Sequence, residues 1–461
     1  MSRGTFIDLC YLIAAVGFIL ALKALSSPRG ARIGNLLGAA GMLLAIGVTF
    51  ARPGLSHIGL IVGAMALGVV VGVPAARLVK MTAMPQMVAA FNGVGGGAAA
   101  VVSITEFIGT DTKLVATYKV LEVILGVTIG SVSFAGSVVA FAKLQELMTG
   151  RPITYPGQQP VNGLVGAVVL GLVIATLVTS STALLWVVLG ISLVLGAILV
   201  LPIGGADVPV LISLLNSFTG LAVAASGFTL GSNVLIVAGT LVGASGMLLT
   251  RMMSKAMGRS IPNILFSAFG SVVTASGDST GPEGRSVRAG TTDDVGVLLA
   301  YSQKVVIIPG YGLAVAQAQH TARELADALS ARGVSVFYAI HPVAGRMPGH
   351  MNVLLAEADV PYDELREMDE ANPEMSTTDV ALVVGANDTV NPAAHTTPGS
   401  PIYGMPIINA DQAKNIVFLK RSMRPGFAGI DNDLLYDPKT TMLFGDAKDT
   451  LQKLVTSVGS A

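Results

Sequence analysis

Charged side chains are scarce in this chain of 461 residues: Asp, Glu, Lys and Arg make up 12% of it, against 52% hydrophobic residues. A soluble domain usually carries about 25% charged residues. The shortage is confined to residues 1–275, because residues 276–461 contain most of the charged side chains. The division predicts a membrane domain followed by one globular domain of ordinary size.

Cysteine and histidine are scarce as well. The single cysteine, Cys10, lies inside an apolar run, which excludes a disulfide framework within the chain and gives no support for a metal site. The 28 basic and 28 acidic residues balance, so nothing indicates binding to nucleic acid. No histidine lies between residues 58 and 319, so the chain's own helices are not expected to contain a histidine proton relay.

Long apolar runs dominate the first part of the chain. A membrane span needs about 20 mostly apolar residues. About nine segments meet this condition and predict a multi-span α-helical membrane bundle over residues 1–260. The segments are 5–25, 33–51, 56–74, 85–108, 120–142, 162–180, 182–202, 208–230 and 233–253.

Basic residues are distributed unevenly between the connections of these spans. One side, which includes the C-terminal domain, carries Lys23, Arg29, Arg32, Arg77, Lys80, Lys143, Arg151, Arg251, Lys255 and Arg259. The other side carries only Arg3, Arg52, Lys113 and Lys119. Because Lys and Arg concentrate in cytoplasmic loops, this bias predicts an outside N-terminus and a cytoplasmic C-terminal domain.

Polar side chains within the spans are costly and therefore informative. Asn92 precedes the glycine run 95–97, Asn216 lies on the eighth span, and Asn233 opens the ninth. They are explained either by hydrogen bonds between helices or by a hydrated path for an ion or proton. The glycine run itself suggests a bend, since consecutive glycines weaken a helix.

Glycines at small-xxx-small spacing recur along the spans. This spacing lets helix backbones approach closely in lipid. It therefore predicts that these glycines lie at helix–helix contacts. The pairs are Gly34/Gly38, Gly59/Gly63, Gly68/Gly72, Gly93/Gly97, Gly126/Gly130 and Gly239/Gly243.

The C-terminal part alternates short β-branched runs with helical patterns, after an expected linker over residues 261–300. Strands are predicted at 304–308, 334–340, 380–384, 416–419 and 442–444. One helix is expected from the turn after the first strand to Arg332, with Gly333 as its cap, and a last one over 447–458. Alternation of this kind predicts an α/β doubly wound, Rossmann-like domain over residues 301–461.

The turn after the first of these strands has the form Gly310-x-Gly312-x-x-Val315. In a βαβ unit, such glycines favour a tight turn and close approach of a pyrophosphate. The sequence therefore favours dinucleotide binding, with a plain strand–helix turn as the alternative. The end of the second strand carries His341 and no acid that would hold a ribose 2′-hydroxyl. Basic residues are available at Arg346, Lys420 and Arg421, which favours NADP(H) over NAD(H).

Two further loops follow predicted strands, at 384–392 and 420–429, and the second resembles a lid. Neither contains an acid–base pair or a nucleophile, so no catalytic residue is predicted. Hydride transfer needs none, because the cofactor carries the chemistry.

Six stretches together are more specific than any of these motifs: 133–141 and 214–220 in the spans, and 309–319, 343–353, 385–393 and 420–423 beyond them. On these residues the chain resembles, over nearly its whole length, the beta subunit of proton-translocating NAD(P) transhydrogenase. The resemblance implies that the C-terminal domain binds NADP(H) and that an alpha subunit, as one chain or two, holds NAD(H). Hydride then passes from NADH to NADP⁺, by the Si-specific/Re-specific translocase reaction, while a proton crosses inward. It also implies a bacterial cytoplasmic (inner) membrane and a dimer of the alpha–beta complex.

The resemblance implies roles for individual residues. Asp388 is a candidate for coupling, and Asn92, Asn216 and Asn233 are candidates for the proton path. The expected NADP(H) contacts come from the glycine turn and five later segments. They are Gly310, Tyr311, Gly312, Val315, Val343, Ala344, Gly345, Arg346, Met347, Pro348, Gly385, Ala386, Asn387, Asp388, Thr389, Gly404, Met405, Lys420, Arg421, Ser422, Met423, Arg424, Pro425, Gly426, Phe427, Asp446 and Ala447.

The chain departs from some members of the family at Asn92, where they have a membrane histidine. Either a partner subunit brings that histidine, or Asn92 and a water carry the step. Two other functions stay open: a transporter with a regulatory NADP(H)-sensing domain, and a membrane-tethered oxidoreductase for a small molecule. The second would need acid–base residues of its own, which the sequence does not show.

Overall fold

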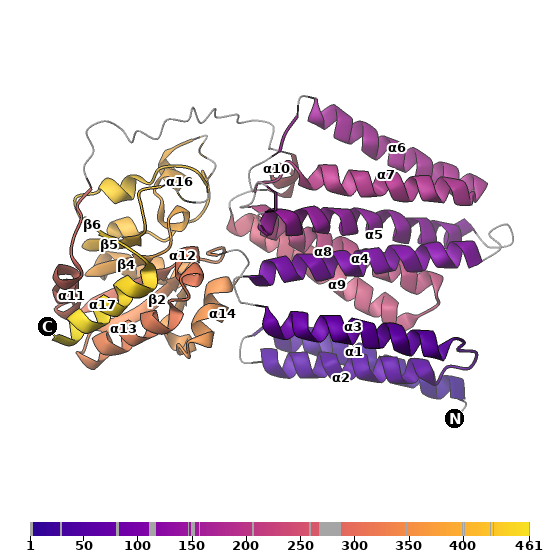
Figure 1. Cartoon of the computed structure of the whole chain (residues 1–461), viewed down its shortest axis with the longest axis horizontal. Coiled ribbons are helices and arrows are strands. Elements are labelled where there is room, and N and C mark those ends of the chain that lie inside the picture. The colour runs from indigo at the N-terminus through magenta and orange to yellow at the C-terminus, as the bar shows by residue number, and fades with distance from the viewer. Residues whose placement is uncertain are drawn as a thin grey trace. The chain divides into compact units, whose positions relative to one another are not determined.

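The chain forms a helical part and an α/β part (Figure 1). The structure is a computed structural model, and it describes residues 3–27, 30–79, 83–109, 117–145, 147–148, 153–155, 157–204, 207–257, 260–266, 287–345, 349–398, 400, 402–424, 426 and 428–460. Two compact units are present: residues 1–204 with 210–250, and residues 205–209 with 251–461.

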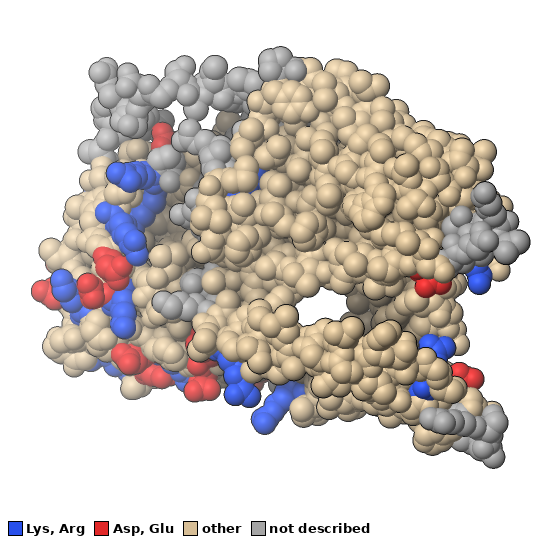
Figure 2. All heavy atoms as spheres, turned by 45° about the vertical axis from the view of Figure 1, so that its right-hand side comes forward, with Lys and Arg blue, Asp and Glu red and all other residues tan. Residues whose placement is uncertain are grey.

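Nine helices within the described residues are long and apolar enough to cross a membrane. This confirms the predicted multi-span bundle. The helices are α1 (Arg3–Leu25), α2 (Ala31–Phe50), α3 (Ile58–Leu78), α4 (Met84–Gly109), α5 (Thr117–Leu144), α6 (Gln158–Thr179), α7 (Thr182–Val200), α8 (Val208–Thr229) and α9 (Asn233–Ala256). In the space-filling view charged side chains gather over the α/β part, and those visible on the helical part lie toward the ends of the helices (Figure 2).

Glycines bring α4, α5, α8 and α9 into close contact. A Cβ on Gly96 would lie 3.0 Å from the Gly130 carbonyl oxygen, and one on Gly95 would lie 3.2 Å from Thr219. On α9, a Cβ on Gly239 would overlap the backbone of Ala224. The run 95–97 therefore serves packing against two neighbouring helices, and α4 continues through it as a helix.

The glycines of α3 behave differently. A Cβ added at Gly59, Gly63, Gly68 or Gly72 would meet nothing within 4 Å, and no described residue of α3 is buried. The prediction that these two pairs mark helix contacts is wrong within this chain, because no described helix covers them.

The α/β part is built on a six-stranded parallel sheet in the order β3-β2-β1-β4-β5-β6. Its strands are β1 (Lys304–Pro309), β2 (Ser335–Ile340), β3 (Leu365–Glu367), β4 (Val380–Val384), β5 (Asn415–Lys420) and β6 (Thr440–Phe444). Alternate residues of each central strand enter opposite cores: Val305 and Ile307 pack on one face, and Val306 and Ile308 on the other. Burial on both faces explains the continuous apolar runs. The doubly wound fold is confirmed.

Helices cover both faces of the sheet. One face packs against α11 (Thr292–Ala300), α12 (Tyr311–Val315), α13 (Gln319–Ala331), α14 (His350–Glu357) and α17 (Ala447–Ser460). The other face packs mainly against short elements. These are α15 (Met368–Ala371), η4 (Asn372–Thr377), η6 (Ala410–Gln412) and η7 (Asp433–Tyr436). The element η5 (Asp388–Val390) adds Val390 to the same core. The remaining elements are α10 (Ile261–Phe266), η3 (Tyr362–Glu364) and α16 (Ala393–Thr396). The expected linker thus contains α10 and α11 among its described residues.

The predicted single helix to Arg332 is wrong. The chain leaves α12 after Val315, and Gln317 has a left-handed φ of 49° before α13 begins. Gly333, predicted as the cap, has a φ of 84°, and the Val334 amide donates to the Leu329 carbonyl, as expected for a glycine C-cap.

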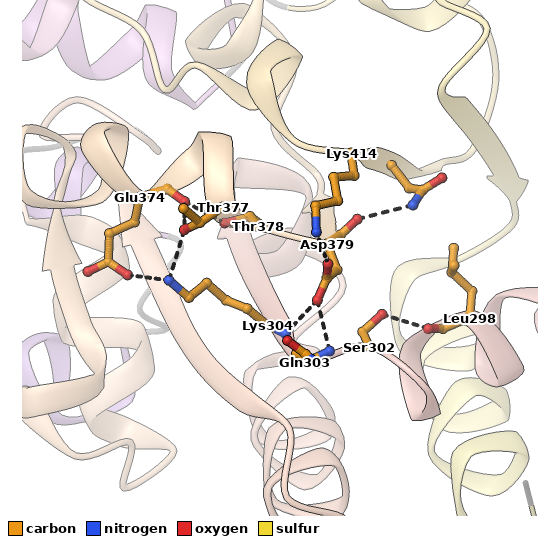
Figure 3. Close-up of polar contacts among 10 residues, drawn as sticks. Leu298, Ser302, Gln303, Lys304, Glu374, Thr377, Thr378, Asp379 and Lys414 are labelled. Atoms are coloured by element: carbon orange, nitrogen blue, oxygen red, sulfur yellow. Dashed lines mark hydrogen bonds and ion pairs between the residues drawn. The ribbon is translucent and has the colours of Figure 1, made fainter.

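Ion pairs join the amino ends of the central strands (Figure 3). One oxygen of Asp379 accepts the backbone N–H groups of Gln303 and Lys304 at 2.8 and 3.0 Å, and the other accepts from Lys414 Nζ at 2.8 Å. Glu374 pairs with Lys304 Nζ at 2.8 Å and with Arg366. These bonds hold the pKa of both carboxyls below their ordinary values, chiefly through Lys304 for Glu374 and Lys414 for Asp379.

Candidate functional site

The predicted contact residues of the α/β part lie at one edge of the sheet. Each group follows the carboxyl end of a strand: 310–315 after β1, 343–345 after β2, 385–389 after β4, 420–426 after β5, and 446–447 after β6. Because the strands are parallel, these ends share one edge, where open α/β sheets bind ligands. Arg346, Met347, Pro348, Pro425 and Phe427 lie outside the described residues.

The glycine turn after β1 packs directly on the loop after β4. The Gly310 amide donates to the Val384 carbonyl at 2.9 Å, and the Gly312 amide to the Gly385 carbonyl at 3.0 Å. A Cβ on Gly310 would overlap the backbone of Ala386, and one on Gly312 would lie 2.7 Å from Gly385 Cα. Gly310 is extended, with φ −135°, so it is not required by a left-handed turn. A glycine is required here because the two loops lie in close contact.

Asp388 receives the loop that follows β5. Its Oδ2 accepts a hydrogen bond from the backbone amide of Ala428 at 2.8 Å. Its Oδ1 accepts one from the side-chain nitrogen Nδ2 of Asn387 at 3.0 Å. A Cβ on Gly426 would lie 2.5 Å from Asp388 Oδ1. The predicted lid segment and the predicted coupling residue are therefore in direct contact.

The β5 end supplies cations. Lys420 donates to the Arg424 carbonyl at 2.9 Å. Burial lowers the pKa of Lys420, and the charges of Asp388 and Asp431 oppose that shift. Arg421 pairs with Asp446, after β6, at 3.2 Å. A half-buried amine beside a guanidinium at the carboxyl edge suits a phosphate ester, which supplies the negative charge and acceptors that both groups favour.

Other predicted contacts lie on this edge with different exposure. Met405 is buried, and Gly404 has a left-handed φ of 82°. Val315 is 44% exposed, so it does not pack helix against strand as the third glycine of the motif would. The ring of Tyr311 lies against His350, with centroids 6.3 Å apart.

Some residues of this edge were not predicted. The Asn432 side chain donates to the Asn387 carbonyl at 3.1 Å, and the Asn391 side chain donates to the Asp431 carbonyl at 3.0 Å. These bonds join the loops after β4 and β5. The first connects residues 45 positions apart in the sequence, and the second connects residues 40 positions apart. Asn391 belongs to the recognised stretch 385–393, whereas no sequence signal marked Asn432.

In the helical part, Asn92 lies in a buried network of neutral side chains. Its Nδ2 donates to Ser137 Oγ at 2.9 Å and lies 3.4 Å from Ser133 Oγ. Ser133 in turn bonds Thr219 Oγ1 at 2.6 Å, and Thr219 donates to the Asn92 carbonyl at 3.3 Å. Asn92 Oδ1 is buried and has no partner among the described residues.

The other two proton-path candidates stand apart from this network. Asn216 is half-buried on α8, and Asn233 is exposed at the start of α9. Among the described residues, no hydrogen bond joins this network to either of them. Ser133 and Ser137 were not singled out from the sequence, although both lie within the recognised stretch 133–141.

These features are those of a membrane protein that carries a Rossmann-like unit with cations at its carboxyl edge. Comparison with known proteins narrows the class. The family model for "NAD(P) transhydrogenase beta subunit" matches residues 7–457. Two relatives, both named "NAD(P) transhydrogenase subunit beta" and both from Rhodospirillum rubrum, one assigned to a particular strain, are each 47% identical over 456 residues, which cover 97% of this chain and 98% of the relative. The chain belongs to the NAD(P) transhydrogenase beta subunit family.

Proposed function

We propose that this chain is the NADP(H)-binding subunit of a proton-translocating transhydrogenase, active only with its alpha partner. Its 301–461 domain binds NADP(H), and the alpha subunit, as one chain or two, presents NADH. Hydride transfer is of the Si-specific/Re-specific type and is coupled to inward movement of a proton. The observation that carries the proposal is the gathering of the expected contacts, drawn from five strands, on one sheet edge.

NADP(H) supplies the hydride chemistry when it is bound, and the chain's residues supply position and charge. Lys420, Arg421 and Ser422 hold the 2′-phosphate, since the first two bring positive charge to the end of β5. Gly310, Gly312 and Gly385 let the two loops pack backbone against backbone. Of the phosphate-binding segment 343–348, the described residues 343–345 follow β2.

Asp388 is the proposed coupling residue. As a carboxylate it accepts the Ala428 amide, and so holds the lid segment 420–429. A proton on that oxygen weakens it as an acceptor and so loosens the lid. Protonation and NADP(H) retention are thereby linked through one contact, as coupling between a proton and a ligand requires.

The proposed proton path begins at Asn92. The Ser133, Ser137 and Thr219 hydroxyls both donate and accept, so together with water they can pass a proton along. An amide cannot titrate, so either the alpha partner supplies a histidine or a water on Asn92 Oδ1 carries the step. Asn216 and Asn233 stay candidates for the continuation of the path. One charge crossing ~180 mV is worth ~4 kcal/mol, enough to drive the exchange toward NADPH.

For location, we propose a bacterial cytoplasmic (inner) membrane, with the N-terminus outside and the C-terminal domain in the cytoplasm. The alpha–beta complex is proposed to form a dimer. The bias of basic residues between the connections supports the orientation.

The test reconstitutes the chain with its alpha partner in liposomes that contain an internal pH probe. NADH and an NADP⁺ analogue are added, and both cofactor reduction and internal pH are followed. We expect reduction together with a pH change. Reduction without proton movement contradicts the pump, and NADP(H) binding without hydride exchange supports a transporter with a sensing domain instead. An Asp388→Asn variant should bind NADP(H) without the pH dependence of the unsubstituted chain.

A further inference from the structure

His341 is buried at the end of β2, where dinucleotide-binding proteins often carry the acid that reads the ribose. Only 1% of its surface is exposed. Both ring nitrogens are engaged: Nε2 lies 2.7 Å from the Pro406 carbonyl oxygen, and Nδ1 accepts the Val343 amide at 3.2 Å. The imidazole is therefore turned inward, between two loops.

These bonds fix the protonation state of the ring. A carbonyl oxygen only accepts, so Nε2 carries the hydrogen, and Nδ1 must be bare to accept from Val343. Burial also lowers the pKa of His341 to about 4, while the bond to Pro406 opposes that shift. At neutral pH the side chain is a neutral linker with one donor and one acceptor.

The partner of His341 belongs to a segment that connects several loops of the carboxyl edge. We call residues 404–408 the strap. The Gly404 amide donates to the Ala394 carbonyl at 2.8 Å, and the Ile408 amide to the Thr389 carbonyl at 2.9 Å. His341 holds its middle, at Pro406. The strap thus joins the loops after β2 and β4, the two strands that flank β1.

Two proposed NADP(H) contacts, Gly404 and Met405, lie on the strap, and two more, Val343 and Ala344, lie on the turn that His341 starts. The Ala344 amide donates to the His341 carbonyl at 3.0 Å, which closes that turn. One side chain therefore sets the distance between two parts of the expected site.

We propose that His341 is a positioning residue for the nucleotide: its imidazole fixes the strap to the turn after β2 and so holds Gly404, Met405 and the 343–345 turn in their binding positions. The inference rests on the proposed function, because it deepens the NADP(H) site. It also means that the His341 side chain does not itself read the ribose 2′-position, which leaves that role to basic residues elsewhere on the edge.

The two bonds can be separated by substitution. In His341→Gln, the amide nitrogen can still donate to Pro406, and in His341→Asn the amide oxygen can still accept from Val343. His341→Ala removes both. We expect the Kd of the full-length chain for NADPH to rise about tenfold in His341→Ala, from the loss of two net hydrogen bonds. The rise should be smaller in His341→Gln, which keeps the strap bond, than in His341→Asn.

Two control variants separate position from stability. Val458→Ala removes a buried side chain of α17, and His320→Asn alters an exposed histidine on α13. NADPH binding and the melting temperature are measured for all variants in detergent, and the KM for NADH and NADP⁺ with the alpha partner present. We expect the KM for NADP⁺ to rise while the KM for NADH is unchanged.

An unchanged NADPH Kd in folded His341→Ala overturns the inference and leaves the proposed function intact. An equal rise in Val458→Ala at an equal loss of melting temperature also overturns it, since the effect is then one of stability. Absence of NADPH binding by the unsubstituted chain overturns the proposed function as well, which distinguishes the two failures.

Discussion

The two edges of the parallel sheet use their polar groups in opposite ways. At the amino edge, carboxylates and amines satisfy one another: Asp379 joins the starts of β1, β4 and β5, and Glu374 pairs with Lys304 (Figure 3). Glu374 also pairs with Arg366 of β3. At the carboxyl edge, loops approach through glycines, and the amine of Lys420 lies beside neighbouring carboxylates. The amino edge is joined chiefly by ion pairs, while the carboxyl edge is joined chiefly by backbone contacts, with Lys420 and Arg421 at its rim.

The largest effect is expected from a methyl group between the loops of the carboxyl edge. Gly385 has φ 70°, and a Cβ there would overlap Gly312 and Leu313. We expect Gly385→Ala to destabilise the soluble unit by about 3–5 kcal/mol, because overpacking adds to the left-handed conformation. Urea unfolding of the full-length chain, followed by hydrogen exchange of β1 peptides, measures it.

Gly333→Ala is the matched control for that substitution. Gly333 has a similar φ of 84°, but a Cβ there meets nothing within 4 Å. Its cost should be about 1 kcal/mol, from the left-handed conformation alone. Equal losses at the two glycines would show that the loop contact contributes nothing.

The second-largest effect is on the free energy of unfolding at acid pH. The two edges should lose stability in different pH ranges. The pKa of His341 is lowered from 6.5 to about 4 by burial, so the unfolded chain binds a proton that the folded chain does not in this interval. Neutral His341 therefore makes its full contribution to the free energy of unfolding above pH 6.5. As pH falls toward 4, about 3 kcal/mol of that free energy is lost. The pKa values of Asp379 and Glu374 are lowered in the folded chain. Their contributions to stability are therefore lost only as pH falls below the ordinary pKa values, 3.8 for Asp379 and 4.5 for Glu374.

The same unfolding measurement, repeated from pH 7 to pH 4, tests this order. His341→Asn should remove the slope between pH 6.5 and 4, while Asp379→Asn should leave that slope in place. A slope in this range that survives in His341→Asn would assign it to another group.

The third effect compares the two ends of one strand. Lys420 ends β5 and Lys414 precedes it. We expect Lys420→Ala to raise the Kd for NADPH about 10- to 100-fold, as for loss of a charged hydrogen bond, with the KM for NADH unchanged. Lys414→Ala should leave both unchanged. Equal weakening of both cofactors by Lys420→Ala would count against the proposed role.

The sequence was informative about the carboxyl edge and nearly silent about the amino edge. Apolar, β-branched runs predicted five of the six strands, and parallel pairing then placed the loops that follow them on one edge. The strand β3 was missed because it has three residues, two of them Arg366 and Glu367, and no apolar run. The break at Gln317 was missed because a glutamine, and not a glycine or proline, adopts the left-handed conformation that follows α12.

Long-range side-chain contacts explain the rest. Asp379 accepts amides 75 and 76 residues earlier in the chain, and no spacing rule connects those positions. His341 likewise bonds a carbonyl 65 residues away. Such contacts form only once the sheet brings distant strand ends together. Local sequence patterns therefore predict which residues lie at an edge, but not the side-chain bonds between them.

The smallest effect is expected from removing the Asp379 hydrogen bonds and ion pair at the amino edge. Asp379→Ala removes the acceptor of two amides and the partner of Lys414, but Gln303 is exposed and water can replace the carboxylate there. We therefore expect a loss of about 1–2 kcal/mol in unfolding free energy, and no change in the Kd for NADPH. Asp369→Ala, in the first turn of α15, is the comparison for loss of an acidic side chain on the same unit. If Asp379→Ala weakened NADPH binding at unchanged stability, the two edges would be coupled through the strands, and the separation between an ion-paired edge and a binding edge would fail.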